Sequence, residues 1–241
     1  MSFRMIDNAM NIPQHISIIM DGNGRWARQQ GKRRLFGHNA GVEAVRDTTT
    51  HCAELGVRYL SLFAFSEENW DRPAEEVKGL MELLFKSMLE ERETLLKNQV
   101  RFRVIGNTEH LSESLLAAIH KLEEETAVGT GLTLLVMLSY SGKWDILQAA
   151  KHYASDCLAA GKQLPLDETA FSRYLATAGI PDPDLMIRTS GEQRISNYML
   201  WQCAYSEFYY TPVLWPDFRK TDLDEAIQSY NRRERRYGKV E

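Results

Sequence analysis

The residues best suited to chemistry in this sequence follow a short apolar run near the N-terminus. Residues 16–20 predict a buried strand that stops at Asp21, and a Gly-Asn-Gly turn then leads toward a helix. Several cations follow, at Arg28, Lys32, Arg33 and Arg34. Because the first turn of a helix leaves backbone N–H groups unpaired at its positive end, this arrangement can hold an anion. Phosphate is the ligand that we expect.

A second group suited to anions lies at residues 188–197. It combines two arginines with hydroxyl groups near a glycine: Arg188, Thr189, Ser190, Gly191, Arg194 and Ser196. Guanidinium forks and hydroxyls match the oxygens of phosphate groups. Two anion sites and the carboxylate of Asp21 predict two phosphorylated substrates that share a divalent metal.

Each of these residues also has a simpler interpretation. Asp21 can cap the helix that follows it, and Arg188 and Arg194 can form surface ion pairs. His38 can be a loop or capping residue. Glu75 and Glu76 suit the first turn of a helix. The chemical interpretation depends on the joint placement of these residues.

Alternating strands and helices must position these groups. Strands are predicted at 16–20, 57–63, 101–105, 133–138, 185–188 and 208–210, and helices at 39–55, 73–96, 115–122, 143–158, 167–176 and from 221 onward. Thr221 and Asp224 have the spacing of a capping box. The pattern predicts a single α/β domain over residues 1–241, with a central, mostly parallel sheet of about six strands flanked by helices. Residues 1–12 are expected to form a flexible N-terminal segment.

In an open parallel sheet, ligands bind beyond the carboxyl ends of the strands. Asp21, Ser66 and Arg188 are each expected at such an end, as is the segment 139–143. The helix predicted at 73–96 has an apolar face wider than one sheet contact requires. That face can belong to the core, to a dimer surface or to a lipid tunnel.

Composition limits the class of protein. The formal net charge of −4 argues against general nucleic-acid binding. Three widely spaced cysteines fit free thiols in a reducing cytosol better than disulfides or a zinc site. The N-terminus lacks the apolar region of a signal peptide, and no apolar run is long enough to span a bilayer.

One rival function comes from the turn after Asp21. The segment GNGRWA formally satisfies the pattern G-x-G-x-x-G/A of dinucleotide-binding proteins. Against this, Gly31 and the basic run 32–34 cut the helix short, and no acidic residue follows a second strand at the spacing that a ribose contact needs. A Walker lysine pattern is absent as well.

The chain resembles the cis-prenyltransferases, most closely the bacterial undecaprenyl diphosphate synthases. The matching segments, in order along nearly the whole chain, are HISIIMDGNGRWA, GKRRLFGHNAG, LFAFSEENWDRPAEEV, DLMIRTSGEQRISNYMLWQCAYSEFYYTPVLWPDF and NRRERRYG. The match is specific because several long segments agree.

This resemblance implies that the chain condenses an allylic diphosphate, farnesyl diphosphate, with successive isopentenyl diphosphates to a long cis-polyprenyl diphosphate, the carrier-lipid precursor of cell-wall synthesis. It implies a Mg²⁺ cofactor, a homodimer, a hydrophobic tunnel for the growing chain, and a cytoplasmic location with contact to the membrane surface for product release. Nucleic-acid partners are not expected.

The resemblance also assigns roles to individual residues. Asp21 is the essential carboxylate and a metal ligand, with Glu207 of the partner subunit as the second metal ligand. His38, Ser66 and Asn69 are candidates for assisting proton transfer. The substrates are held by residues on the matching motifs: Gly22, Asn23, Gly24, Arg25 and Arg34 for the allylic diphosphate, Arg188, Arg194 and Ser196 for isopentenyl diphosphate, and further Trp26, His38, Ser66, Asn69, Trp70, Arg72, Glu76, Arg236 and Gly238.

The sequence departs from the family pattern at two places. Many relatives have Asn-Tyr-Gly-Gly-Arg where this chain has residues 139–143, and Lys143 cannot copy a bidentate guanidinium contact. Met137 and Leu138 are bulky where some relatives have alanine, which predicts a narrower tunnel. The competing functions are a dinucleotide-dependent oxidoreductase and a non-catalytic partner subunit, and the intact set of Asp21 and arginines speaks against the second.

Overall fold

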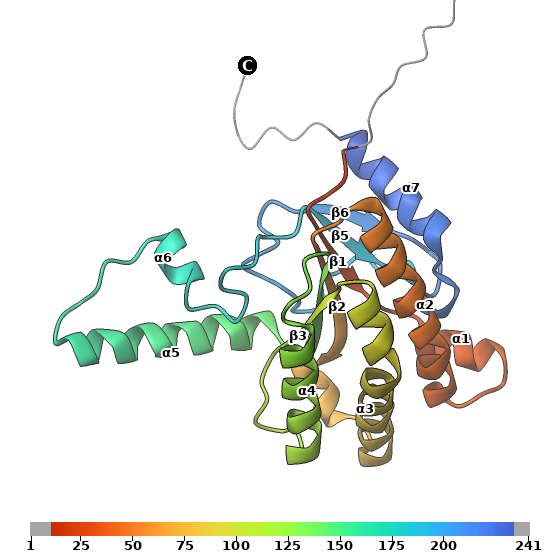
Figure 1. Ribbon diagram of the computed structural model, residues 1–241, viewed down its shortest axis with the longest axis horizontal. Coiled ribbons are helices and arrows are strands. Elements are labelled where there is room, and N and C mark those ends of the chain that lie inside the picture. Colours follow the sequence, from red (N-terminus) through yellow and green to blue (C-terminus); the bar gives the residue numbers. More distant parts are fainter. Residues whose placement is uncertain (1–10, 234–241) are drawn as a thin grey trace, which may run out of the picture.

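A six-stranded parallel sheet forms the centre of the structure (Figure 1), a computed structural model in which residues 11–233 are described. The strand order is β3-β4-β2-β1-β5-β6, and every neighbouring pair is parallel. The strands are β1 (His15–Ile19), β2 (Tyr59–Ser66), β3 (Arg101–Ile105), β4 (Thr133–Tyr140), β5 (Leu185–Arg188) and β6 (Glu207–Tyr210). The prediction of a mostly parallel α/β sheet is therefore confirmed.

Helices cover both faces of this sheet. They are α1 (Asn23–Gln29), α2 (Arg34–Leu55), α3 (Ala74–Lys97), α4 (Glu113–Thr126), α5 (Gly142–Ala160), α6 (Glu168–Ser172) and α7 (Lys220–Asn231), with short 3₁₀ helices η1 (Glu67–Asp71) and η2 (Trp215–Asp217). Residues of α2, α3, α4 and α7 share one apolar core with the sheet. The opposite face packs against the start of α5 and the segment 198–203, and the rest of α5 projects from the body of the molecule (Figure 1).

The strand order reverses beside β1. From β1 the chain continues to β2 on one side, whereas β5 and β6 lie on the other side. Connections that leave in opposite directions open a crevice at the carboxyl ends of the two central strands, which is where open α/β sheets bind ligands. Asp21 follows β1, and Arg188 ends β5. Both predicted anion groups therefore meet at one crevice.

Two glycines shape the turn that follows Asp21. Gly22 has a φ of 110°, a conformation that side chains with a Cβ rarely adopt. A Cβ on Gly37 would lie 2.0 Å from the backbone oxygen of Asn23. Glycine at these positions lets α1 and α2 pack closely, and it fixes where the turn residues point.

Two helix starts differ from the sequence prediction. Helix α1 ends at Gln29, before Gly31 as predicted. Helix α2 begins at Arg34, ahead of the start predicted at residue 39. The predicted capping box of Thr221 and Asp224 is wrong. Helix α7 begins at Lys220, where the Arg219 backbone N–H donates to Asp222 Oδ2 at 2.8 Å. Asp224 lies 2.8 Å from His51 Nε2 on α2 instead, because tertiary packing brings these side chains together.

The predicted flexible segment 1–12 lies outside the described residues except for its last two. Asn11 exchanges two hydrogen bonds with Asn231, its N–H donating at 2.9 Å and its carbonyl accepting at 3.1 Å. These bonds attach the start of the described chain to the end of α7.

His15 is a fully buried histidine at the start of β1. Its Nδ1 lies 2.6 Å from the Pro181 carbonyl and must carry the proton, so Nε2 accepts from the Ser61 hydroxyl at 2.6 Å. Burial lowers the pKa of His15 to about 4, against a smaller opposite effect of the bond to Pro181. The neutral ring fits this site, and a charged ring does not.

We expect the free energy of unfolding to fall as the pH drops from about 6.5 to 4. The unfolded chain protonates this histidine near its ordinary pKa and the folded chain only near 4, so the unfolded state binds more protons in that window and the loss is on the order of 3 kcal/mol. Urea unfolding at several pH values measures it. A His15→Gln variant should show a flatter pH dependence, and an unchanged slope would contradict the assignment.

Candidate functional site

Asp21 and Arg188 form the centre of the crevice between β1 and β5. Arg188 Nη2 donates to Asp21 Oδ2 at 2.8 Å, and Arg25 Nη2 lies 3.4 Å from the same oxygen. Burial alone would raise the pKa of the Asp21 carboxyl, but hydrogen bonds from Arg188 and Ser190 outweigh that effect and hold the pKa below its usual range. Asp21 is therefore ionised at neutral pH.

Arg188 is the most buried cation of the crevice, with 4% of its surface exposed. Its Nη1 donates to Ser196 Oγ at 2.8 Å and to the backbone oxygen of Arg194. Its Nε is buried and has no hydrogen-bond partner among the described residues. A buried N–H without a partner is costly, so this donor indicates that the crevice accommodates a further acceptor group.

The loop after β5 is tied to the turn after β1. Thr189 Oγ1 accepts from the Asp21 N–H at 2.9 Å, and Arg25 Nη1 donates to the Ser190 backbone oxygen at 2.9 Å. Ser190 has a φ of 78° and Ser196 one of 50°, which are uncommon for residues other than glycine. The loop is thus held in one specific shape. From the sequence, Thr189 and Ser190 can be predicted only as hydroxyls that match phosphate oxygens, because their contacts with the distant turn depend on the fold.

A basic hollow opens on the other side of Asp21. It has a volume of about 410 Å³ and is lined by the glycine turn and by five cations, Arg25, Arg28, Lys32, Arg33 and Arg34. Arg28, Lys32 and Arg33 form no ion pair with any described residue. Unpaired cations around a concave surface attract a multiply charged anion. The two sequence-predicted anion groups therefore lie on either side of one carboxylate.

Residues of η1 and its flanks form a hydrogen-bonded rim. Asn69 Oδ1 accepts from the Ser66 N–H at 3.1 Å, and Trp70 Nε1 donates to Ser139 Oγ at 2.8 Å. Glu76 Oε1 accepts from Arg72 at 3.2 Å and lies 3.4 Å from Arg34 Nε. The side chains predicted from the segment LFAFSEENWDRPAEEV thus lie together beside the crevice, and Ser139 joins them.

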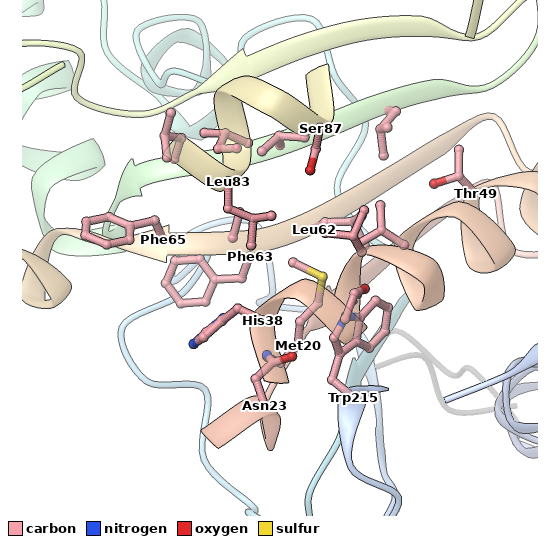
Figure 2. Close-up of a pocket in the computed structure, with 18 of the residues that line it drawn as sticks. Met20, Asn23, His38, Thr49, Leu62, Phe63, Phe65, Leu83, Ser87 and Trp215 are labelled. Atoms are coloured by element: carbon pink, nitrogen blue, oxygen red, sulfur yellow. Dashed lines mark hydrogen bonds between the residues drawn. The ribbon is translucent and has the colours of Figure 1, made fainter. Parts of the chain in front are cut away.

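His38 lies on α2 and faces a large cavity next to the crevice (Figure 2). Burial and the charges of Arg72 and Arg34 lower the pKa of His38 to about 4. Its Nε2 and the nearby Asn23 Oδ1 are buried without a partner among the described residues. A neutral imidazole with a free nitrogen can accept a proton or a hydrogen bond from a bound molecule.

The large cavity runs from the crevice between the sheet and the helices α2 and α3, with a volume of about 1000 Å³. Its floor includes Leu62, Leu134, Val136 and Leu138 of β2 and β4. Figure 2 shows side chains of α3, such as Leu83, on one side of the cavity and His38 on the other. An apolar cavity of this size suits a long hydrocarbon chain. The apolar face of α3 thus lines a tunnel-like cavity.

The structure separates the two bulky residues that were predicted to narrow the tunnel. Leu138 lines the cavity, but Met137 is fully buried on the opposite face of the sheet, beside Tyr140 and Tyr198. Side chains alternate along a strand, so neighbouring residues cannot face the same side. The prediction for Met137 is wrong.

We expect Leu138→Ala to widen the space for a hydrocarbon chain and Met137→Ala to leave it unchanged. Both substitutions should lower the free energy of unfolding by about 2–5 kcal/mol, since each removes a buried side chain. The resemblance to cis-prenyltransferases implies prenyl products, and chromatographic sizing of these products distinguishes the two variants, with longer products only from Leu138→Ala. Equal shifts in both variants would contradict the assignment of faces.

Glu207 does not join this site within one chain. Glu207 begins β6 beside Leu185, at the amino end of the strands and so opposite to Asp21. It accepts from Arg233 Nη1 at 2.7 Å. Arg236 and Gly238 lie outside the described residues.

The carboxylate of Asp21 fits one part of a magnesium site. Mg²⁺ is commonly held by one or two carboxylates together with phosphate oxygens and water. The described residues contain no group of three or more His, Cys, Asp or Glu side chains that could hold a metal alone. Asp21, ionised and placed between two anion-binding surfaces, fits a Mg²⁺ that a phosphorylated ligand helps to bind.

Comparison with known proteins gives a consistent result. The family model described as "Putative undecaprenyl diphosphate synthase" matches residues 19–238. The chain is 50% identical to an isoprenyl transferase of Chlorobaculum tepidum, covering 95% of this chain and 87% of that protein. It is also 50% identical to a ditrans,polycis-undecaprenyl-diphosphate synthase ((2E,6E)-farnesyl-diphosphate specific) of Vibrio cholerae, covering 94% and 91%.

A solved structure is similar over almost its full length. Lavandulyl diphosphate synthase from Lavandula x intermedia, in complex with dimethylallyl diphosphate, matches with a TM-score of 0.90 and 35% identity, covering 95% of this chain and 99% of that chain. The described part of the present chain contains no helix long and apolar enough to cross a membrane.

Proposed function

Because the chain belongs to the undecaprenyl diphosphate synthase family, we propose that it condenses farnesyl diphosphate with successive isopentenyl diphosphates to a long cis-polyprenyl diphosphate, of the undecaprenyl type. The observation that carries this proposal is the joint placement of two cationic surfaces, one ionised carboxylate and a 1000 Å³ apolar cavity. Phosphate groups fit the first two, and the prenyl chain fits the cavity.

In each condensation the allylic C–O bond breaks and diphosphate leaves, a C–C bond forms to isopentenyl diphosphate, and a proton is lost from the new unit. The basic hollow around Arg25 and Arg34 stabilises the charge that develops on the leaving diphosphate. Arg188, Arg194 and Ser196 hold the diphosphate of isopentenyl diphosphate. The floor of the cavity at Leu62 and Leu138 is apolar, and the acidic residues that border the cavity are Asp21 and Glu68 near the crevice and Glu54 and Glu91 on the two helices. The cationic carbon therefore meets mainly hydrocarbon on the floor.

Asp21 would hold Mg²⁺, which supplies positive charge to the diphosphate oxygens when bound. The pair with Arg188 keeps Asp21 ionised and orients it. His38, Ser66 and Asn69 are the groups that we propose for assisting proton loss. Of these, His38 is neutral at pH 7 and faces the cavity with a free nitrogen.

The second metal ligand requires a second copy of the chain. Glu207 cannot reach Asp21 in its own subunit, because the two lie at opposite ends of the parallel strands. We propose a homodimer, which the projecting helix α5 supports: Leu147 and Leu158 on this helix are 62% and 83% exposed. We also propose that the enzyme acts in the cytoplasm and delivers its product to the membrane surface, since a long prenyl chain partitions into lipid.

The direct test incubates the pure protein with farnesyl diphosphate, labelled isopentenyl diphosphate and Mg²⁺, and sizes the extracted products. Elongated prenyl products would support the proposal, and their absence would overturn it. Binding of a nicotinamide cofactor would favour the dinucleotide-dependent alternative. A protein that binds both diphosphates without turnover would instead be the non-catalytic partner subunit.

A further inference from the structure

The roof of the large cavity is the seam between α2 and α3, which lie side by side (Figure 1). Each helix turns an apolar stripe toward the cavity, including Val42 and Val45 on α2 and Leu84 and Met88 on α3. Polar side chains also border the cavity along the two facing helices: Arg46, Thr50 and Glu54 on α2, Ser87, Glu91 and Thr94 on α3, and Asn98 directly after α3. Their spacing of three or four residues places each set on one helix face.

Two ion pairs join α2 to α3 within the described residues. The first, Arg34 with Glu76, stands at the mouth and belongs to the rim of the diphosphate site. The second joins Arg46 to Glu91. Arg46 follows Arg34 by twelve residues, so the second pair stands about 18 Å deeper along α2. No diphosphate held at the crevice touches it.

The deeper pair has the geometry of a specific contact. Arg46 Nε lies 2.9 Å from Oε1 and 3.1 Å from Oε2 of Glu91, and Arg46 Nη2 also donates to Oε1. The Glu91 side chain is 19% exposed. Glu91 forms no ion pair with any other described residue. A bidentate arginine–carboxylate pair fixes the relative position of two helices better than a single contact does.

An ion pair in the wall of a hydrocarbon cavity is not explained by stability. The Arg46 side chain is 49% exposed, so its charge stays in contact with water. Ion pairs of this kind contribute little to the free energy of unfolding. An ion pair and an apolar contact differ in how a hydrocarbon ligand affects them. A prenyl chain can replace an apolar contact between two helices, but it offers no favourable interaction to the two groups of a separated ion pair. The pair can therefore keep the seam closed against such a chain.

We propose that the Arg46–Glu91 ion pair closes the seam between α2 and α3 over the deep half of the cavity and thereby limits the length of the prenyl product. This inference rests on the proposed function. While the pair is intact, the growing tail is confined by the far end of the cavity. When the pair is broken, the tail can pass between the two helices, and further condensations continue.

The test compares Glu91→Gln with a matched control, Glu125→Gln. Arg92 Nε lies 2.5 Å from Glu125 Oε2 and joins α3 to α4, and neither residue borders the cavity. Each variant thus removes one charge from an inter-helix pair with α3. Products made from farnesyl diphosphate and labelled isopentenyl diphosphate are sized, the KM of each substrate is measured, and thermal unfolding is followed.

We expect Glu91→Gln to give longer products over a broader range, by one or more isoprene units, and Glu125→Gln to give the wild-type range. Arg46→Gln should reproduce the first result. The double exchange Arg46→Glu with Glu91→Arg should shift the range back toward wild type. The KM of both substrates should be unchanged in Glu91→Gln, since the pair touches neither diphosphate site.

Wild-type product lengths from both Glu91→Gln and Arg46→Gln, shorter products, or equal shifts in Glu91→Gln and Glu125→Gln would overturn the inference while the proposed function stands. If the wild-type protein makes no elongated product, both fall together. Loss of folding in one single variant leaves the other single variant and the double exchange to decide.

Discussion

An Asp21→Ala variant is expected to lose turnover by on the order of a hundredfold or more, because it removes charge stabilisation aimed at the transition state. Asp21 is the ionised carboxylate between the two anion-binding surfaces, 2.8 Å from Arg188. The variant lacks the carboxylate that we propose as the Mg²⁺ ligand. The loss should appear in kcat at saturating concentrations of both substrates.

The fold should tolerate this change. The contacts that place the turn come from the backbone of Asp21, whose N–H donates to Thr189 Oγ1 at 2.9 Å and whose carbonyl accepts from the Trp215 N–H at 3.0 Å. Asp47→Asn, at a surface carboxylate of α2 that lies 3.9 Å from Arg219, provides the control. Near-normal turnover of Asp21→Ala with added Mg²⁺ would remove Asp21 from the mechanism.

Arg188→Lys is expected to lower kcat/KM for isopentenyl diphosphate, again by on the order of a hundredfold, although the charge is kept. The guanidinium contacts Asp21 and Ser196, both at 2.8 Å, and the Arg194 backbone oxygen at the same time. A single ammonium group cannot hold these positions together. The pKa of Asp21 should rise toward its usual range, since Arg188 provides the main interaction that lowers it.

Two measurements separate geometry from charge at Arg188. Steady-state kinetics at varied isopentenyl diphosphate gives the loss, and a pH profile of kcat should show its acidic limb displaced upward. Arg58→Lys, at an exposed arginine just before β2 and so at the other end of the sheet, serves as control. Kinetics of Arg188→Lys that match those of the control would show that only the charge matters.

Much of this site could be predicted because its signals are local. The apolar run before Asp21, the glycine turn and the cluster at 188–197 each lie within about a dozen residues, and strand ends of a parallel sheet share one edge. The predicted strands and helices agree closely with the structure. Gly31 and the basic run also end α1 where expected.

The errors concern features that local patterns do not encode. Met137 is apolar in a continuous apolar strand, so only the packing of both sheet faces shows that it points away from the cavity. The start of α7 is set at Arg219, and Asp224 contacts a residue of α2 that is 173 positions away.

The sequence by itself determined the fold class and the chemical character of the two anion-binding surfaces, because periodicity and residue type act over short range. Only the tertiary structure decided which distant groups meet. The strand order places β5 next to β1, which brings Arg188 to Asp21 across 167 positions. The packing of α2 on α3 likewise creates the Arg46–Glu91 pair across 45 positions, and parallel register separates Glu207 from Asp21. These are long-range contacts, and the sequence around each residue does not indicate which distant residue it contacts.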